Sequence, residues 1–408
     1  MHNRFKFLFK PKTHWFLYIL LLVLTPFLLL QNYLQSFIGQ MSVQSFEIFS
    51  INFPYTVAIA LLLFITLIIF LWKKITSIRL IGWGIILFLF WIGQKSTDYY
   101  FNHDFYELQY NWHYFAYGIF AYLSYRMLST KNISPQKIIL YVYISAICIS
   151  TFDEAIQMPL SNRIFDLGDI AKDLWGAIIG LVFIFFILEN GKIIKNAWKI
   201  RQKKIKDYLQ NPISLFLLEI VFAYILMLIS SILTETKYLF SAISISILTF
   251  IIFFIVLHLS QKKLYRNIFI ILFIIFICIQ GVSFYKYKDQ NIVYSKNQLI
   301  IYKGIPVFYF DVLIYPDGMF RLVDKKGTFN KRDLNKIMSF SENILIIGSD
   351  ENISGGRGFP EDSESQFIFN YVNKRGLQVI KLKNKDACKK FNQLCDEGKK
   401  PALILHYD

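Results

Sequence analysis

The chain has few charged residues and few cysteines. Only 18% of its 408 residues are charged, whereas 55% are hydrophobic. Cys148 and Cys278 lie inside apolar runs, and Cys388 and Cys395 lie near the C-terminus. Four cysteines so placed give neither a disulfide framework nor the spacing of a zinc site.

Long runs of Leu, Ile and Phe fill residues 15–285 and then largely stop. A helix of about 20 apolar residues is needed to cross a bilayer, and nine runs approach that length. They cover residues 15–30, 54–72, 80–92, 112–128, 138–152, 170–188, 212–233, 238–257 and 268–284. The sequence therefore predicts an α-helical polytopic membrane protein with about nine transmembrane helices and a C-terminal soluble α/β domain.

The basic residues follow the predicted membrane topology. Of the net charge of +16, +11 falls on residues 1–285, where Lys and Arg gather in alternate loops. Residues 34–53, in an intervening loop, contain neither. By the positive-inside rule the N-terminus is cytoplasmic, and nine crossings then place the C-terminal domain outside. We attribute the positive charge to topology in a lipid bilayer and expect no nucleic-acid partner.

The chain divides into four predicted parts. Residues 1–110 hold the first three spans, 111–190 a central membrane core, 191–285 the last three spans, and 290–408 an α/β domain. In that domain we predict strands at 291–302, 305–315, 319–323, 344–348, 377–382 and 402–407, and helices at 331–340, 363–375 and 385–397. Strands that alternate with helices at this spacing suggest βαβ units and a small parallel sheet.

A group of charged and polar residues separates the fifth and sixth predicted spans. Glu154 and Gln157 share one helix face at the end of the fifth span, and Asp169 and Asp173 share one at the start of the sixth. Arg163 lies in the loop between them. Ionisable groups at membrane depth are costly and usually functional, so these residues are ligand-binding candidates.

The fourth and sixth spans contribute further candidates. His113 and Tyr117 are four residues apart, in the predicted outer half of the fourth span. Gly176 and Gly180 form a small-xxx-small pair that would let the sixth helix pack closely against a neighbour. We therefore expect three helices to bring their polar residues to one depth.

These residues resemble the VanZ-like family of bacterial membrane proteins. The resemblance covers roughly residues 90–190 and is carried by the motifs His113-x3-Tyr117, Glu154-x2-Gln157, Arg163, and Asp169-x3-Asp173-x2-Gly176-x3-Gly180. Family members are linked to low-level resistance to the glycopeptide antibiotic teicoplanin. The resemblance thus implies a bacterial inner or plasma membrane protein with a role in the cell envelope.

The C-terminal domain resembles a second family. Ala387, Cys388 and Asn392, followed by Glu397-Gly398-Lys399, are similar to the small α/β domain that includes a mitochondrial complex I assembly factor. The resemblance covers roughly residues 290–408 and implies a protein partner. A glycine-rich stretch, 355–358, is either an anion-binding loop or a turn, and Cys388 is either a low-pKa thiol or a core residue.

Three interpretations of this cluster of charged and polar residues stay open. Its charges can pair among themselves and fix the loop. Alternatively, Arg163 and the polar helix ends bind an anionic lipid or cell-envelope precursor at the outer leaflet. In the third interpretation, His113, Glu154, Asp169 and Asp173 hold a metal ion, although we predict neither a metal nor a cofactor.

The first function that we predict is binding of such a lipid or precursor without catalysis. The second is a membrane enzyme that acts on a lipid-linked phosphate, with Glu154 or His113 as general base. The third is an assembly scaffold whose C-terminal domain recruits partner proteins.

Overall fold

A computed structural model describes most of the chain. The described residues are 10–27, 37, 40, 44–48, 51–71, 74–99, 108–159, 165–195, 202–233, 238–288, 290–294, 299–308, 311–323, 337–338, 343–349, 365–370 and 375–405. The chain forms two compact units, one built from residues 1–231 and 243–258 and the other from 232–242 and 259–408.

The chain is mostly helical, and six of its described helices are long and apolar enough to cross a membrane. They are α4 (Ser77–Ser96), α6 (Pro135–Gln157), α7 (Leu167–Val182, continued as a π-helix to Leu188), α10 (Pro212–Ile232), α11 (Leu239–Leu259) and α12 (Lys263–Lys286). These six coincide with six of the nine predicted spans and support a lipid bilayer as the environment of the chain.

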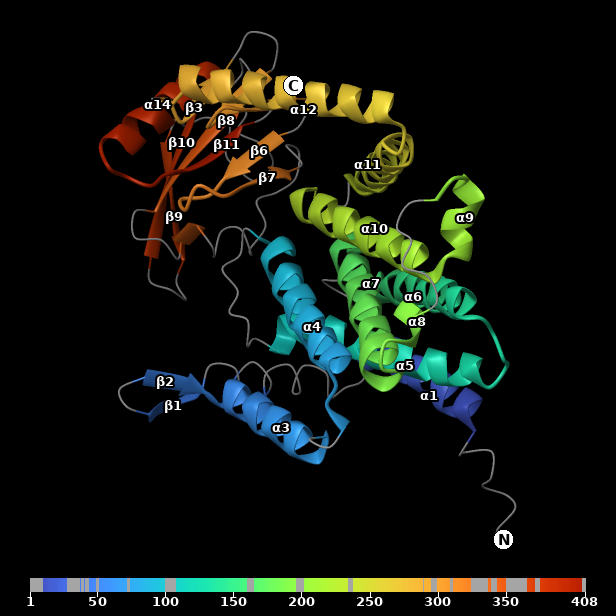
Figure 1. Ribbon diagram of the computed structural model, residues 1–408. Helices are drawn as coiled ribbons and strands as arrows, with labels where there is room; N and C mark the ends of the chain where they lie inside the picture. The colour runs from blue at the N-terminus through green and yellow to red at the C-terminus, as the bar shows by residue number, and fades with distance from the viewer. Residues whose placement is uncertain are drawn as a thin grey trace. The chain divides into compact units, whose positions relative to one another are not determined.

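The other three predicted spans fall on helices that are shorter or more polar. They are α1 (Pro11–Leu24), α3 (Tyr55–Leu71) and α5 (Leu108–Ser129). A hairpin of β1 (Ser45–Ile48) and β2 (Ile51–Pro54) precedes α3, and two short helices, α8 (Lys192–Lys195) and α9 (Ile205–Gln210), precede α10. Figure 1 shows these elements.

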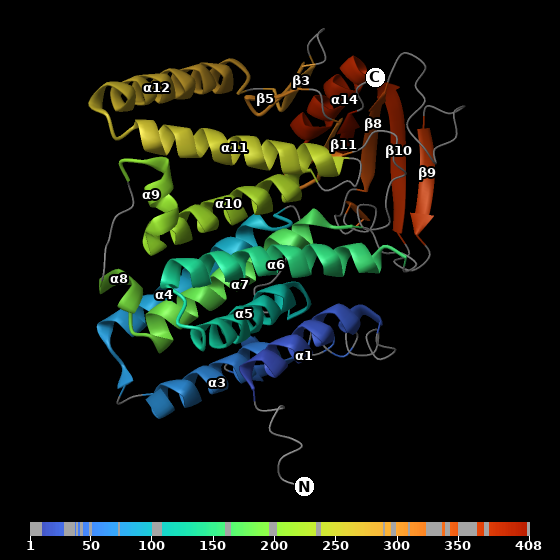
Figure 2. The ribbon, with the colours of Figure 1, turned by 90° about the vertical axis from the view of Figure 1, so that its right-hand side faces the viewer.

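Helix α7 lies at the centre of the first unit. Most of its residues are buried, including Trp175, Ile178 and Leu181. It packs against α4, α5 and α6, and Figure 2 shows α5, α6 and α7 running side by side. A helix that is buried on nearly all sides must be apolar on nearly all sides, so the polar residues at its N-terminal end stand out.

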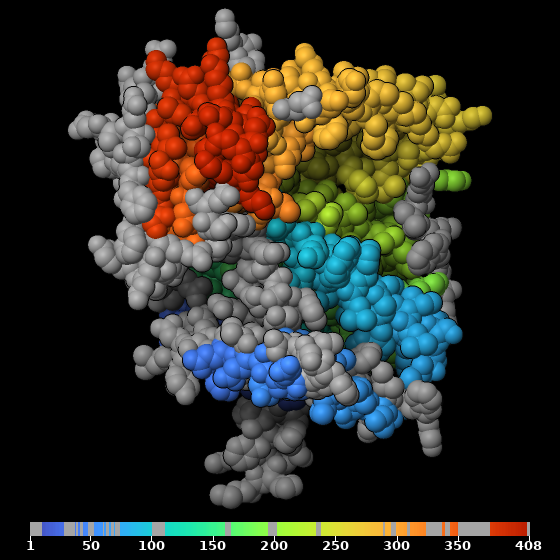
Figure 3. Space-filling view, turned by 90° about the vertical axis from the view of Figure 1, so that its left-hand side faces the viewer, coloured from blue at the N-terminus to red at the C-terminus, as the bar shows by residue number. Residues whose placement is uncertain are grey.

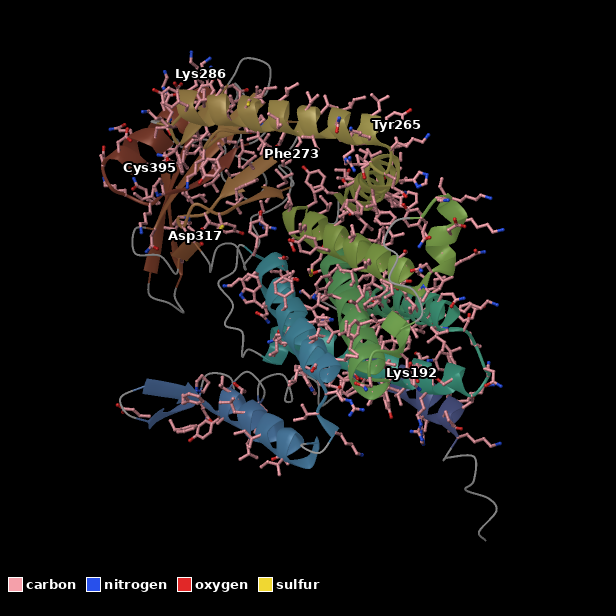
Figure 4. All side chains as sticks on the ribbon, in the orientation of Figure 1. Lys192, Tyr265, Phe273, Lys286, Asp317 and Cys395 are labelled. Carbon is pink, nitrogen blue, oxygen red and sulfur yellow. The ribbon has the colours of Figure 1, made fainter. Side chains whose placement is uncertain are left out.

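Helix α12 of the second unit has no buried residue. Its large apolar side chains are exposed along its length, and Tyr265 and Phe273 are marked in Figure 4. The same helix is uncovered on the face shown in Figure 3. Apolar exposure on this scale is typical of contact with lipid.

The second unit contains a six-stranded mixed sheet of order β7-β6-β11-β8-β10-β9. The strands are β6 (Asp311–Ile314), β7 (Phe320–Val323), β8 (Ile344–Ser349), β9 (Ser365–Asn370), β10 (Arg375–Lys383) and β11 (Ala402–Leu405). The central strands β11, β8 and β10 are parallel, whereas β6, β7 and β9 join antiparallel to their neighbours. The predicted parallel sheet is therefore correct only for the centre.

Helix α14 (Asn384–Asp396) connects β10 to β11 and packs on the sheet. Asn392 joins it to a second sheet of β3 (Ile292–Tyr294), β4 (Leu299–Tyr302) and β5 (Ile305–Phe308). Its side chain accepts a hydrogen bond from the Ile292 N–H at 3.0 Å and donates one to the Ile292 carbonyl at 2.8 Å. Helix α14 is thus held between two sheets.

Two predictions for this unit are resolved and two lie outside the described residues. Residues 365–370 form strand β9, so the helix predicted at 363–375 is wrong there. Cys388 is buried beside Phe391, and burial raises the pKa of its thiol to about 12, which confirms a core role. The glycine-rich stretch 355–358 and most of the helix predicted at 331–340 are outside the described residues.

Candidate functional site

The first contact of the site joins α5, α6 and α7. His113 on α5 places its Nδ1 2.8 Å from Oδ1 of Asp173 on α7. The other carboxylate oxygen of Asp173 accepts a hydrogen bond from the hydroxyl of Ser150 on α6 at 2.6 Å. Asp173 is 3% exposed and Ser150 is fully buried. One buried carboxylate therefore fixes both an imidazole and a hydroxyl.

The second contact is an ion-pair network beside the first. Nζ of Lys172 lies 3.0 Å from Oδ1 of Asp169 and 3.2 Å from Oδ2 of Asp98. The same Asp169 oxygen is 3.6 Å from Nε2 of His113. His113 therefore lies between Asp169 and Asp173, and a single lysine is shared by two carboxylates.

Asp98 reaches this network from the turn after α4. Its backbone has a left-handed conformation (φ 45°), which is uncommon for a residue with a side chain. The hydroxyl of Ser231, at the end of α10, accepts a hydrogen bond from the Asp98 N–H at 3.0 Å. The turn thus holds the Asp98 carboxylate toward Lys172.

The loop that enters α7 is tied to α6 by a fourth carboxylate, that of Glu154. Oε2 of Glu154 accepts a hydrogen bond from the main-chain N–H of Asp166 at 3.0 Å. Asp166 in turn caps α7, because its Oδ1 accepts the Gly168 N–H at 2.7 Å. Burial, together with the nearby charge of Asp169, raises the pKa of Asp166 to about 6.

Close packing of α5 against α7 sets the position of His113. A Cβ on Gly176 would lie 2.8 Å from the His113 carbonyl oxygen, and one on Gly180 would lie 2.6 Å from that of Gly118. These distances are below any normal contact, so only glycine allows the two backbones to approach this closely.

Neighbouring helices hold α5 and α7 from outside. From α1, the Tyr18 hydroxyl donates to the Ala116 carbonyl of α5 at 2.8 Å, and the indole of Trp15 donates to Ser124 at 2.9 Å. From α7, the indole of Trp175 donates to the Leu89 carbonyl of α4 at 2.8 Å. These bonds join α1 to α5 and α4 to α7.

Two buried polar atoms of the site make no hydrogen bond of normal geometry within the described part of the chain. They are Oδ1 of Asp153 and the hydroxyl of Tyr117, which is only 3% exposed and lies near Ser150 and Asp173. Buried polar groups are nearly always hydrogen-bonded. Unsatisfied ones in a cluster are therefore places where a ligand or water can bind.

The excess of acidic over basic side chains in the site limits the kind of ligand that it can bind. Its carboxylates are Asp98, Asp153, Glu154, Asp166, Asp169 and Asp173. Its described cations are Lys172 and, when protonated, His113, so acids outnumber bases. Among the described residues, no group of three or more His, Cys, Asp and Glu side chains has the geometry of a metal site. The interpretation of the polar residues as a metal site therefore finds no set of metal ligands among the described residues.

The structure places most of the candidate residues together. His113, Asp169 and Asp173 are in contact, and Glu154 and Tyr117 lie beside them. Gln157 is buried at the end of α6, and Arg163 lies outside the described residues. Sequence reasoning missed Ser150 and Asp98. Ser150 is one turn before Glu154 on the same helix face and was open to detection, whereas no local signal points to Asp98.

No family model matches the sequence, and no curated protein or solved structure matches it significantly. The two family resemblances therefore rest on the quoted motifs alone.

Proposed function

We propose that the chain is a VanZ-like integral membrane protein that binds the head group of an anionic lipid or cell-envelope precursor. The resemblance is the sole support for the further proposal of a role in teicoplanin-type resistance. The observation that supports binding is that the Tyr117 hydroxyl and Asp153 Oδ1 are buried beside a preformed His113–Asp173 contact and make no hydrogen bond of normal geometry within the described residues.

Because the site has more carboxylates than basic groups, different parts of the head group must bind to different side chains. Carboxylates accept hydrogen bonds and attract cations, so they suit hydroxyl, amide or ammonium groups of the ligand. An anionic part needs a separate basic side chain, and we assign this to Arg163. The ligand class is therefore a head group that carries both hydrogen-bond donors and a negative charge.

The orientation is part of this proposal. We take α1, α3 and α5 as additional spans, which gives nine crossings, a cytoplasmic N-terminus, and a site and C-terminal domain on the outer side. A cysteine introduced by Lys389→Cys on α14 should react with a membrane-impermeant maleimide in intact cells. One introduced by Lys203→Cys, in the predicted cytoplasmic loop before α9, should react only after permeabilisation; the reverse pattern would refute the orientation.

A membrane enzyme that acts on a lipid-linked phosphate is the second candidate. The contact of His113 with Asp173 favours it, because a carboxylate that orients an imidazole is a common arrangement for general-base catalysis. Steady turnover of a lipid-linked phosphate, lost in Glu154→Gln and His113→Gln, would favour catalysis over binding.

Binding is tested by complementation of a strain that lacks the protein. Arg163→Ala and Asp169→Asn should each abolish rescue of the envelope phenotype, including teicoplanin sensitivity, because each removes one side of the proposed ligand contact. Asp386→Asn, on the exposed face of α14, is the matched control and should rescue fully. Full rescue by both site variants at equal protein levels would refute the proposal.

A further inference from the structure

The first unit of the chain contains a buried acid, Glu219, that is separate from the candidate site. Glu219 lies on α10 and is 5% exposed. Both of its carboxyl oxygens are buried, and neither has a hydrogen-bond partner within the described residues. An unpaired carboxylate in an apolar interior is very costly, so such a group is expected to be neutral.

The buried neighbours of Glu219 on its own helix are apolar. On its own helix, Leu215, Phe216 and Ala223 are buried within one turn of it. From α6, Tyr143 donates its hydroxyl to the main-chain carbonyl of Glu219 at 3.3 Å, and Tyr143 is itself buried. Within the described residues, Tyr143 is the titratable group that faces Glu219, and no charged side chain acts on it.

Helix α6 connects this position to the candidate site. Tyr143, Ser150 and Glu154 are all buried and lie on one face of α6 at helical spacing. Tyr143 is seven residues before Ser150, a rise of about 10 Å along the helix. Tyr143, which contacts Glu219, is therefore two turns of α6 away from Ser150, the residue of α6 that contacts Asp173.

The chemistry of the position favours a proton over a metal cation. Hard cations in proteins are surrounded by several oxygen ligands, whereas here one carboxyl group stands beside one tyrosine hydroxyl that is already bonded to the main chain. A proton needs only the carboxyl group itself. We propose that Glu219, on α10 of the first unit, is a proton-binding site that carries its proton at neutral pH.

Infrared spectroscopy of the full chain in lipid nanodiscs tests this assignment. At neutral pH the wild-type spectrum should contain the carbonyl band of neutral carboxylic acids, and Glu219→Gln should reduce the intensity of this band. Glu189→Gln is the matched control, because Glu189 is half-buried and accepts a hydrogen bond from the Tyr125 hydroxyl. A neutral-acid band unchanged by Glu219→Gln would overturn the proposal.

Chemical labelling of the wild-type chain gives the same answer if the variant does not fold. Dicyclohexylcarbodiimide reacts with neutral carboxyl groups in apolar surroundings: the acid proton moves to a carbodiimide nitrogen, the oxygen adds to the central carbon, and rearrangement gives a stable N-acylurea. Peptide mapping should find this addition on Glu219 and not on Glu189. An unmodified Glu219 under conditions that label other buried acids would contradict the assignment.

Discussion

Replacing Gly180 with alanine is expected to separate α5 from α7 and destabilise the membrane unit. The added Cβ would lie 2.6 Å from the Gly118 carbonyl oxygen and 2.8 Å from the Cβ of Ala121. Main-chain atoms cannot move aside as a side chain can, so the helices must shift. Overpacking of this kind costs about 1–3 kcal/mol, and Gly180→Val should cost more. Thermal unfolding of the purified protein in detergent measures the effect.

Two glycines provide matched controls for this change. Gly118 faces the same interface, yet its added Cβ would lie 3.7 Å from the Gly176 carbonyl oxygen, which is an ordinary contact. Gly84 is on α4 with nothing within 4 Å. Gly118→Ala and Gly84→Ala should therefore unfold near the wild-type temperature. The account of α5–α7 packing fails if Gly180→Ala is as stable as these two.

Replacing Lys172 with methionine should produce the second large effect. Methionine is similar in length but removes the cation shared by Asp98 and Asp169. The two carboxylates, which are 14% and 24% exposed, would then lose the lysine that lies between them. Breaking a buried ion pair by removing one member costs about 3–5 kcal/mol, so we expect a loss of that order in the free energy of unfolding, measured by denaturant titration.

The loss of unfolding free energy caused by Lys172→Met should be smaller when Asp98→Asn is added. The second change removes one of the two negative charges that repel each other. Lys192→Met is the control, since Lys192, marked in Figure 4, is an exposed lysine on α8. A surface change of this kind is usually within about 0.5 kcal/mol. Equal effects for Lys172→Met and Lys192→Met would show that the network contributes nothing to stability.

The sequence predicts the helical spans better than it predicts the C-terminal sheet. Long apolar runs mark a span locally, and six of them coincide with described helices that are long and apolar enough to cross a membrane. Strand β9, in contrast, lies where a helix was predicted, because its pairing with β10 depends on residues further along the chain. The aromatic and β-branched run Phe367-Ile368-Phe369 was the local signal for a strand.

The candidate site shows the same limit. Helical spacing is enough to group Asp169 with Asp173, and Gly176 with Gly180. It cannot show that Asp98 joins Lys172, because that contact depends on a left-handed turn and a bond to Ser231, more than 130 residues away in sequence. Which groups remain unsatisfied is likewise a property of the packed helices and not of any single one.

Native mass spectrometry tests most directly whether the site binds a ligand. The full chain is released from its own membrane in mild detergent. The fraction of protein that retains a bound molecule is then measured for the wild type, Tyr117→Phe and Asp169→Asn. We predict that the wild type retains one lipid-like molecule per chain, that Asp169→Asn retains none, and that Tyr117→Phe retains it in a smaller fraction of the protein. Identical adducts in all three proteins, or none in the wild type, would contradict a ligand site at His113, Asp169 and Asp173.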